Sequence, residues 1–411
     1  MKIKDIIVLI TLGMAGGTIY LLPYMKYYFY NQMIDNTGLS GQNLGFLVTM
    51  FGISSMVVLL PGGVLADRLS SRKCIFLSLI STALLTVAYS FAYKSYVASL
   101  IIWFLLAFTT LFLAWPAIFK AVRIIGGENS STAYSIYYAS NGLTGAIAGY
   151  ITIKLYSVLS VTDQSNAYFW GIWVSVIANI VVAVALYYLL RDMKDSTGDK
   201  GKLPTIHESF SVLKMPIIWV ITLALFCTYT LYVGMTFFTP YLTSAFGVSD
   251  ETSGTLSLVR SYIFMSLTPL TGIIADKYFK STLKWFLVVC PIVAISLLII
   301  ILIGERISFN ILVMSLTMFA AFFVCTIYAS MFSILSECKI PIAVAGTAIG
   351  LVSVFAYTPD SIMQPLFGYF ADNNQYNLIF ITLLCAAILA CLSCLLLLMM
   401  NKKNSNNNVE C

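Results

Sequence analysis

The chain has 411 residues, of which 60% are hydrophobic and only 10% are charged, and its formal net charge at pH 7 is +6. Its mean hydropathy of +0.91 excludes a soluble globular protein. Apolar runs of about 20 residues, each long enough to cross a bilayer core, recur along its whole length. A helix satisfies its own backbone hydrogen bonds in lipid, so we expect an all-α integral membrane protein.

Twelve apolar runs predict twelve transmembrane helices, arranged as two pseudo-symmetric six-helix bundles. In chain order the predicted spans are 6–29, 44–66, 74–92, 97–119, 132–153, 168–190, 217–243, 253–274, 285–303, 309–334, 342–369 and 377–400. The first run follows a basic start, and no small-residue cleavage site closes it. We therefore expect a retained helix rather than a signal peptide.

A long polar segment separates the first six spans from the last six. We expect an N-terminal bundle over 1–190, a cytoplasmic loop over 191–216, a C-terminal bundle over 217–400 and a disordered cytoplasmic tail over 401–411. Lys and Arg concentrate in alternate loops, and this bias predicts that both termini lie in the cytoplasm. The same bias accounts for the net positive charge, so we expect no nucleic-acid partner.

The residue patterns argue against an enzyme. The single histidine, His207, lies in the polar segment, and the nine cysteines include no CxxC pair. We therefore expect no metal site, no cofactor and no disulfide framework. The chain also lacks the GxxxxGK[ST] phosphate-binding loop, which argues against direct use of ATP.

The sequence contains an internal repeat. Residues 38–68 align without a gap on residues 247–277, at an offset of 209 residues. The alignment pairs glycines, aspartates and cations of the two copies: Gly63 with Gly272, Asp67 with Asp276, and Arg68 with Lys277. Duplicated six-helix halves are typical of secondary transporters.

The stretch "PGGVLADRLSSRK" (61–73) resembles the signature between helices 2 and 3 of the major facilitator superfamily, with Ser70 in place of its usual glycine. This resemblance implies a transporter that moves a small molecule by alternating access between two bundles. It also implies that Asp67 lies beside the start of helix 11 and helps to lock the two halves together. The latch residues that we expect are Gly63, Asp67, Arg68, Arg72, Arg123, Gly272, Asp276 and Lys277.

Two further stretches, "YLLPYMKYYFYNQM" (20–33) and "WPAIFKAVRIIGG" (115–127), resemble the organophosphate:phosphate antiporters of that superfamily. In those proteins a helix-1 cation binds phosphate, and Lys26 lies at about that place. Their second phosphate-binding cation, an Arg in helix 7, has no counterpart in residues 229–242. The resemblance therefore covers only one of the two cations that bind phosphate in that family. Carboxylate carriers of the superfamily have a helix-8 Arg, and Arg260 matches it in position.

Arg260 lies about eight residues inside the eighth predicted span. A charge at mid-membrane costs roughly 2.5–3.5 kcal/mol on insertion scales, so it needs a function or a partner. Ser253 and Ser257 share its helix face and indicate a polar surface. We expect Arg260 to bind the substrate, and the alternative is a structural ion pair.

Asp360 lies at a similar depth in the eleventh predicted span, where Ser353, Tyr357 and Gln364 share its helix face. Pro359 and Pro365 predict a kink in this helix. Asp360 is expected either to neutralise Arg260 or to act as a proton-coupling acid, because burial raises and a nearby cation lowers the pKa of a carboxyl group.

Two weaker candidates complete the predicted binding site. Lys26 either points into a central cavity or extends to the membrane surface, as lysines near helix ends do. Tyr138 and Asn141 share one face of the fifth predicted span, where Gly142, Gly145 and Gly149 allow close helix contact. The alternative for this face is packing alone.

These residues predict a secondary active transporter of a small organic anion, driven by protons or by exchange. It would act as a monomer in the lipid bilayer of the cytoplasmic membrane. The expected substrate-binding residues are Arg260, Lys26, Tyr357, Gln364, Tyr138 and Asn141, with Asp360 for proton coupling or ion pairing. The alternatives are a neutral-solute or drug efflux carrier and a transporter-like membrane sensor.

Overall fold

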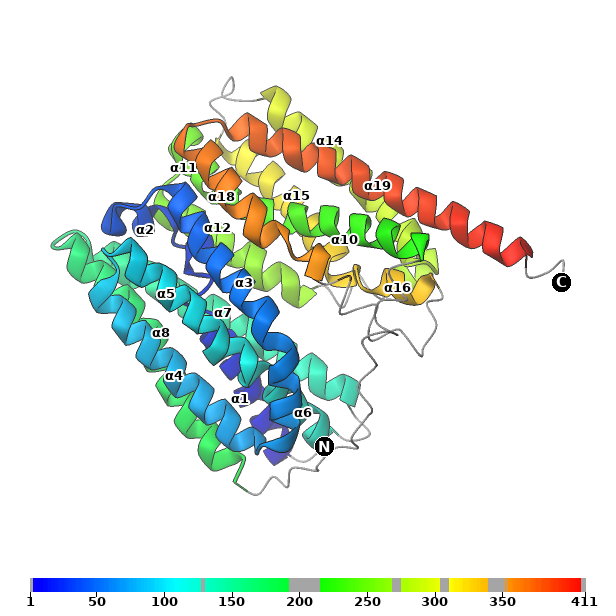
Figure 1. Ribbon diagram of the computed structural model, residues 1–411. Helices are drawn as coiled ribbons and strands as arrows, with labels where there is room; N and C mark the ends of the chain where they lie inside the picture. Colours follow the sequence, from blue (N-terminus) through cyan, green and yellow to red (C-terminus); the bar gives the residue numbers. More distant parts are fainter. Residues whose placement is uncertain are drawn as a thin grey trace. The chain divides into compact units, whose positions relative to one another are not determined.

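The computed structural model describes residues 3–126, 130–191, 215–267, 275–303, 310–338, 352 and 354–407 (Figure 1). Every regular element within these ranges is a helix. The predicted all-α fold is therefore confirmed for these ranges. The described residues pack into two compact units, and the first consists of Met1–Lys200 together with Val248–Ser266. It thus includes a segment from the second half of the sequence.

The first unit consists of α-helices joined by short 3-10 and π-helical segments. In chain order its described elements are α1 (Ile3–Ile19), η1 (Met25–Tyr27), α2 (Tyr30–Thr37), α3 (Gly41–Arg68), α4 (Ser71–Ala92), α5 (Tyr96–Ala107), η2 (Phe108–Phe112), α6 (Ala114–Gly126), α7 (Ser130–Leu159), α8 (Gln164–Leu189), α12 (Asp250–Leu258) and η6 (Val259–Ile263). Buried side chains of α1, α4, α6, α7 and α8 form a continuous core. Burial of this apolar surface positions the helices that carry the candidate site.

The second unit consists of Gly201–Gly247 and Leu267–Cys411. Its described elements are α10 (Pro216–Gly234), η5 (Met235–Phe237), α11 (Phe238–Phe246), η7 (Ala275–Phe279), α14 (Thr282–Ile303), α15 (Asn310–Ser330), α16 (Ser333–Glu337), α18 (Pro359–Asp372) and α19 (Tyr376–Asn407). The long helix α19 lies beside α10 and α14 (Figure 1). A Cβ atom on Gly234 would come within 2.2 Å of Leu383, so α10 and α19 approach closely there.

Within the described residues, nine helical segments are long and apolar enough to cross a membrane. They are Gly41–Val58, Ser71–Ala92, Tyr96–Gly126, Ile136–Leu159, Gln164–Leu189, Pro216–Phe246, Thr282–Ile303, Ile311–Ser330 and Tyr376–Lys402. The predicted spans 6–29 and 253–274 are interrupted, because α1 ends at Ile19 and α12 passes into the π-helix η6. Much of the predicted span 342–369 lies outside the described residues.

The internal repeat is visible in the backbone. A 3-10 turn, a short helix and a left-handed glycine follow one another in each copy, as η1 and α2 before Gly38 and as η5 and α11 before Gly247. Gly38 has φ of 70° and Gly247 has φ of 60°, a conformation that favours glycine because it has no Cβ atom. Both end their helices as αL caps, so this pair of the predicted alignment occupies equivalent places.

Candidate substrate-binding site

The candidate site in the first unit begins where the turn η1 packs against helix α12. The Ser257 hydroxyl donates a hydrogen bond to the backbone carbonyl of Tyr27. One turn earlier, a Cβ atom on Gly254 would lie only 2.8 Å from the carbonyl oxygen of Tyr28. A serine and a glycine at these positions therefore let α12 approach the backbone that follows α1.

Two buried cations lie close in sequence to this contact. Lys26 precedes Tyr27 directly and is 3% exposed, whereas Arg260 follows Ser257 by three residues and is 1% exposed. The Lys26 ammonium lies 5.9 Å from the centre of the Tyr30 ring, within the range of a cation–π contact. Because Lys26 is buried, the structure favours an interior position over extension to the membrane surface.

Arg260 belongs to the five-residue π-helix η6 rather than to a regular α-helix. Such π-turns inside helices occur frequently at functional sites. The chain from Leu258 to Ser266, which includes this segment, packs against three glycines of α7: Cβ atoms on Gly142, Gly145 and Gly149 would come within 2.5 Å of the side chains that face them. The close helix contact that the sequence predicted at these glycines is confirmed.

Tyr138 and Asn141, the two candidates from the fifth predicted span, lie on α7 in different surroundings. The Asn141 amide donates a 3.4 Å hydrogen bond to the Tyr137 hydroxyl and packs against Gly16 of α1. Tyr138 is 50% exposed and makes edge contacts with Phe119 and Tyr137. Packing accounts for the contacts of Asn141, while Tyr138 keeps a large accessible surface.

The candidate site in the second unit centres on Asp360, in the first turn of α18. The positive end of a helix dipole stabilises a carboxylate at this position. The Tyr229 hydroxyl, from α10, donates a hydrogen bond to Asp360 Oδ2. The Tyr229 ring also meets the Tyr357 ring edge to face, with centroids 4.6 Å apart.

Two more tyrosines extend this cluster. Tyr232 stacks on Tyr328 with ring centroids 4.0 Å apart, and the centroid of Tyr229 lies 5.8 Å from that of Tyr328. Gln364, one turn into α18, is fully buried. Sequence reasoning missed Tyr229, Tyr232 and Tyr328, and the available signal was the spacing of Tyr229 and Tyr232, three residues apart on one helix.

At the predicted kink in the eleventh span, one helical segment ends and a new helix, α18, begins. Tyr357 and Thr358 form a turn, and α18 begins at Pro359, which has no N–H group to donate. The expected continuous helix face from Ser353 to Gln364 is therefore interrupted, and Ser353 lies outside the described residues. Arg260 belongs to the first unit and Asp360 to the second, so their pairing stays a prediction.

Most of the expected latch lies outside the described side chains. This applies to Gly63, Asp67, Arg68, Arg123, Gly272 and Asp276. Arg72 is described, and its guanidinium carbon lies 3.8 Å from the centre of the Tyr187 ring. Lys277 is exposed and lies 6.0 Å from the centre of the Tyr278 ring.

Polar contacts fasten the first turn of α12 to the rest of the first unit. Glu251 forms a salt bridge with Lys154 and accepts a 2.9 Å hydrogen bond from the Ser157 hydroxyl. Both partners lie in the last two turns of α7. These donors hold the pKa of Glu251 below its usual value. The Asn31 amide donates a 2.6 Å hydrogen bond to Asp250. The segment that carries Arg260 is therefore anchored to both α7 and α2.

Comparison with known sequences identifies the family. The sequence model of the Major Facilitator Superfamily matches residues 6–358. The inner membrane protein YihN of Escherichia coli strain K12 is 26% identical over 386 residues, which cover 92% of this chain and 91% of YihN. The inner membrane protein YqcE of the same strain is 24% identical, over 89% of this chain and 87% of YqcE.

Comparison with solved structures shows the same fold. A bacterial homologue of the human lysosomal transporter Spinster, in an inward-facing and unoccupied conformation, matches with a TM-score of 0.75. It is 14% identical, and the match covers 98% of both chains. The nucleoside transporter NupG, solved as a mutant, matches with a TM-score of 0.74 and 11% identity over 96% of this chain and 99% of NupG.

Proposed function

The chain belongs to the Major Facilitator Superfamily, and from that premise we propose that this membrane transporter moves a small organic anion by alternating access. The proposal rests on one observation: Lys26 and Arg260 are both buried, and each lies within three residues of the hydrogen bond that joins Ser257 to Tyr27. Two like charges in one low-dielectric region raise the local potential and attract an anion.

The chemistry of the two cations favours a carboxylate or a similar oxyanion. A guanidinium offers a planar fork of donors that matches a carboxylate with two parallel hydrogen bonds. An ammonium adds a compact second charge. The hydroxyl of Ser257 is already engaged with the Tyr27 carbonyl, so the cations themselves supply the recognition of the substrate.

Asp360 supports proton coupling. Its carboxyl group accepts a hydrogen bond from Tyr229 and lies among tyrosine rings, where each change of protonation alters a local hydrogen-bond network. In this proposal a proton on Asp360 accompanies the anion. The Lys and Arg bias of the loops supports a cytoplasmic location for both termini and the cytoplasmic membrane for the protein.

A neutral aromatic or heterocyclic solute is the second candidate substrate. It is supported by the stacked rings of Tyr232 and Tyr328, with Tyr229 and Tyr357 beside them. Tyrosines of this kind stack on a flat solute and supply hydroxyl donors.

Uptake into proteoliposomes tests the proposal. The panel contains radiolabelled carboxylates, sulfonates, sugar phosphates and nucleosides, and each is measured with and without an inward proton gradient. We expect saturable uptake of an anion that other anions inhibit and that Arg260→Gln strongly reduces. The matched control is Lys94→Gln, which removes one positive charge at an exposed position.

Equal anion uptake by Arg260→Gln and the wild type would contradict the anion proposal. Saturable nucleoside uptake that anions leave unchanged would establish the second candidate. A ligand that raises the unfolding temperature without any uptake or counterflow would identify a membrane sensor instead.

A further inference from the structure

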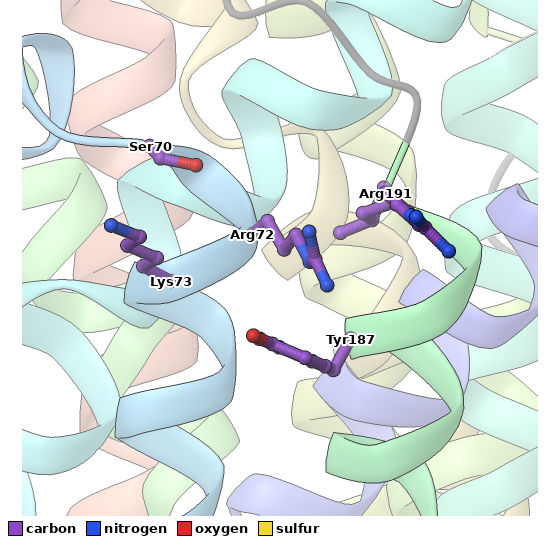
Figure 2. Close-up of a pocket in the computed structure, with 6 residues that line it drawn as sticks. Ser70, Arg72, Lys73, Tyr187 and Arg191 are labelled. Carbon is purple, nitrogen blue, oxygen red and sulfur yellow. The ribbon is translucent and has the colours of Figure 1, made fainter.

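A basic cavity lies at one end of α4 and α8, separate from the candidate binding sites. Its volume is about 120 Å³, well above the roughly 10–15 Å³ that one water molecule needs. The lining residues are Ser70, Arg72, Lys73, Tyr187, Leu190 and Arg191 (Figure 2). Three of these six side chains are cations, and among the described residues that line it none is a carboxylate.

Arg72 is held in place over an aromatic ring, and one of its buried donors has no acceptor among the residues that the structure describes. Its guanidinium carbon lies 3.8 Å from the centre of the Tyr187 ring, a close cation–π contact. Its Nε atom is buried, and no hydrogen-bond acceptor for it occurs among the described residues. A buried donor without an acceptor is costly, and an oxyanion in the cavity would satisfy it.

The start of α4 and the cation that follows α8 reinforce this preference for an anion. Helix α4 begins at Ser71, and the Ser70 side chain makes no capping hydrogen bond. The first backbone N–H groups of a helix and its positive dipole end attract phosphate and similar anions. Arg191 lies two residues beyond the end of α8, where it adds an exposed cation.

The position of the cavity indicates where the anion comes from. Helices α4 and α8 pack side by side, and both are long and apolar enough to span a membrane (Figure 1). The cavity is therefore at the level of the lipid headgroups. Apolar side chains on the neighbouring turns face outward, with Leu77 57% exposed and Val184 45% exposed. They provide a surface along which an acyl chain can lie.

We propose that this cavity binds a phosphate oxyanion, and that its source is the headgroup of an anionic phospholipid. Basic pockets between transmembrane helices on the cytoplasmic side are suited to anionic headgroups. Arg72 and Arg191 contact the phosphate oxygens, and Lys73 adds a third positive charge. The site is independent of the transported solute, so it stands whether that solute is an anion or neutral.

Thermal unfolding of the purified full-length chain tests this site. The chain is measured in a neutral detergent with added phosphatidylglycerol, phosphatidylcholine or inorganic phosphate. We expect phosphatidylglycerol to raise the unfolding midpoint by about 2–4 °C, as a ligand at several times its Kd does. The rise should be at least halved in Arg191→Gln and absent in the double variant Arg72→Gln/Arg191→Gln.

The matched control is Lys284→Gln, which removes an exposed cation at the start of α14 and should keep the full rise. A shift with inorganic phosphate alone that depends on the same arginines would support the oxyanion site and assign it to free phosphate. Equal shifts in the wild type and Arg191→Gln would overturn the proposal, and so would equal shifts with phosphatidylcholine and phosphatidylglycerol. Arg191 is exposed beyond the end of its helix, so its variant carries the test even where Arg72→Gln fails to fold.

Discussion

The two copies of the internal repeat share a 3-10 turn, a short helix and a left-handed glycine but carry different charges. At the offset of 209 residues, Lys26 in the turn η1 corresponds to Met235 in η5, and Arg260 corresponds to Phe51. Phe51 is buried and contacts the Tyr24 ring edge to face, at a centroid distance of 5.7 Å. An aromatic contact in one copy is thus replaced by a buried cation in the other.

This difference shows how a duplicated fold acquires a specific site. The shared positions, such as the left-handed glycines Gly38 and Gly247, maintain the helix ends in both copies. The positions that differ carry the chemistry. Each copy contributes one buried cation, and both cations belong to the first unit, which includes Val248–Ser266. Substitutions that restore symmetry between the copies therefore test the proposed site.

The largest effect is expected when Arg260 is replaced by phenylalanine, the residue at the equivalent position of the first copy. Arg260→Phe should lower kcat/KM for anion uptake by roughly 100-fold, because charge-assisted hydrogen bonds are worth about 1.5–3 kcal/mol each. Arg260→Lys keeps the charge and should retain more activity than Arg260→Phe. Proteoliposome uptake measures both, and similar losses in the two variants would indicate a packing role instead.

The corresponding exchange at Lys26 should have a smaller effect. Lys26→Met introduces the residue of the second copy and should lower kcat/KM for the anion by roughly tenfold, because an ammonium contributes a single charge without the guanidinium fork. Lys94→Met, at an exposed lysine, is the control. The anion site would have to be assigned to Arg260 alone if Lys26→Met transported at the wild-type rate.

The contact between the copies should contribute to stability. Ser257→Val introduces the side chain of Val48, its counterpart, and leaves the buried Tyr27 carbonyl without this donor. A lost hydrogen bond of about 1 kcal/mol should lower the unfolding midpoint by about 2–4 °C. The matched control is Ser315→Val, on a more exposed face of α15. An equal change in the two variants would mean that the contact adds no specific stability.

The smallest effect concerns Asp35, whose counterpart in the second copy is Ser244. Partial desolvation and then the nearby Asp250 carboxylate raise the pKa of Asp35 above its usual value of 3.8. Wild-type stability should therefore fall as the pH rises through this raised pKa, because Asp35 then becomes charged in an unfavourable position.

Asp35→Ser removes that charge. It should unfold at a slightly higher temperature than the wild type at neutral pH, and the difference should vanish in acid, where Asp35 is protonated. Unfolding midpoints across this pH range measure the effect. A difference that persists unchanged in acid would exclude the electrostatic explanation.

Sequence reasoning located the buried charges but not their neighbours. The depth of Arg260 and its serine face follow from counting residues along one helix. The π-turn at Val259–Ile263 and the end of α1 at Ile19 depend on packing between distant segments, which periodicity does not report. The same limitation hid the contact between Tyr229 and Asp360, because the spacing of Tyr229 and Tyr232 marks a helix face but does not indicate which carboxylate it meets.

The central claim is that Lys26 and Arg260 bind one anion together, and a double-mutant cycle on anion affinity tests it most directly. Kd is measured for the wild type, Lys26→Met, Arg260→Phe and the double variant. The shared site predicts strongly non-additive effects, with the double variant little weaker than Arg260→Phe alone. Free-energy losses that simply add, or a single variant with wild-type affinity, would contradict it.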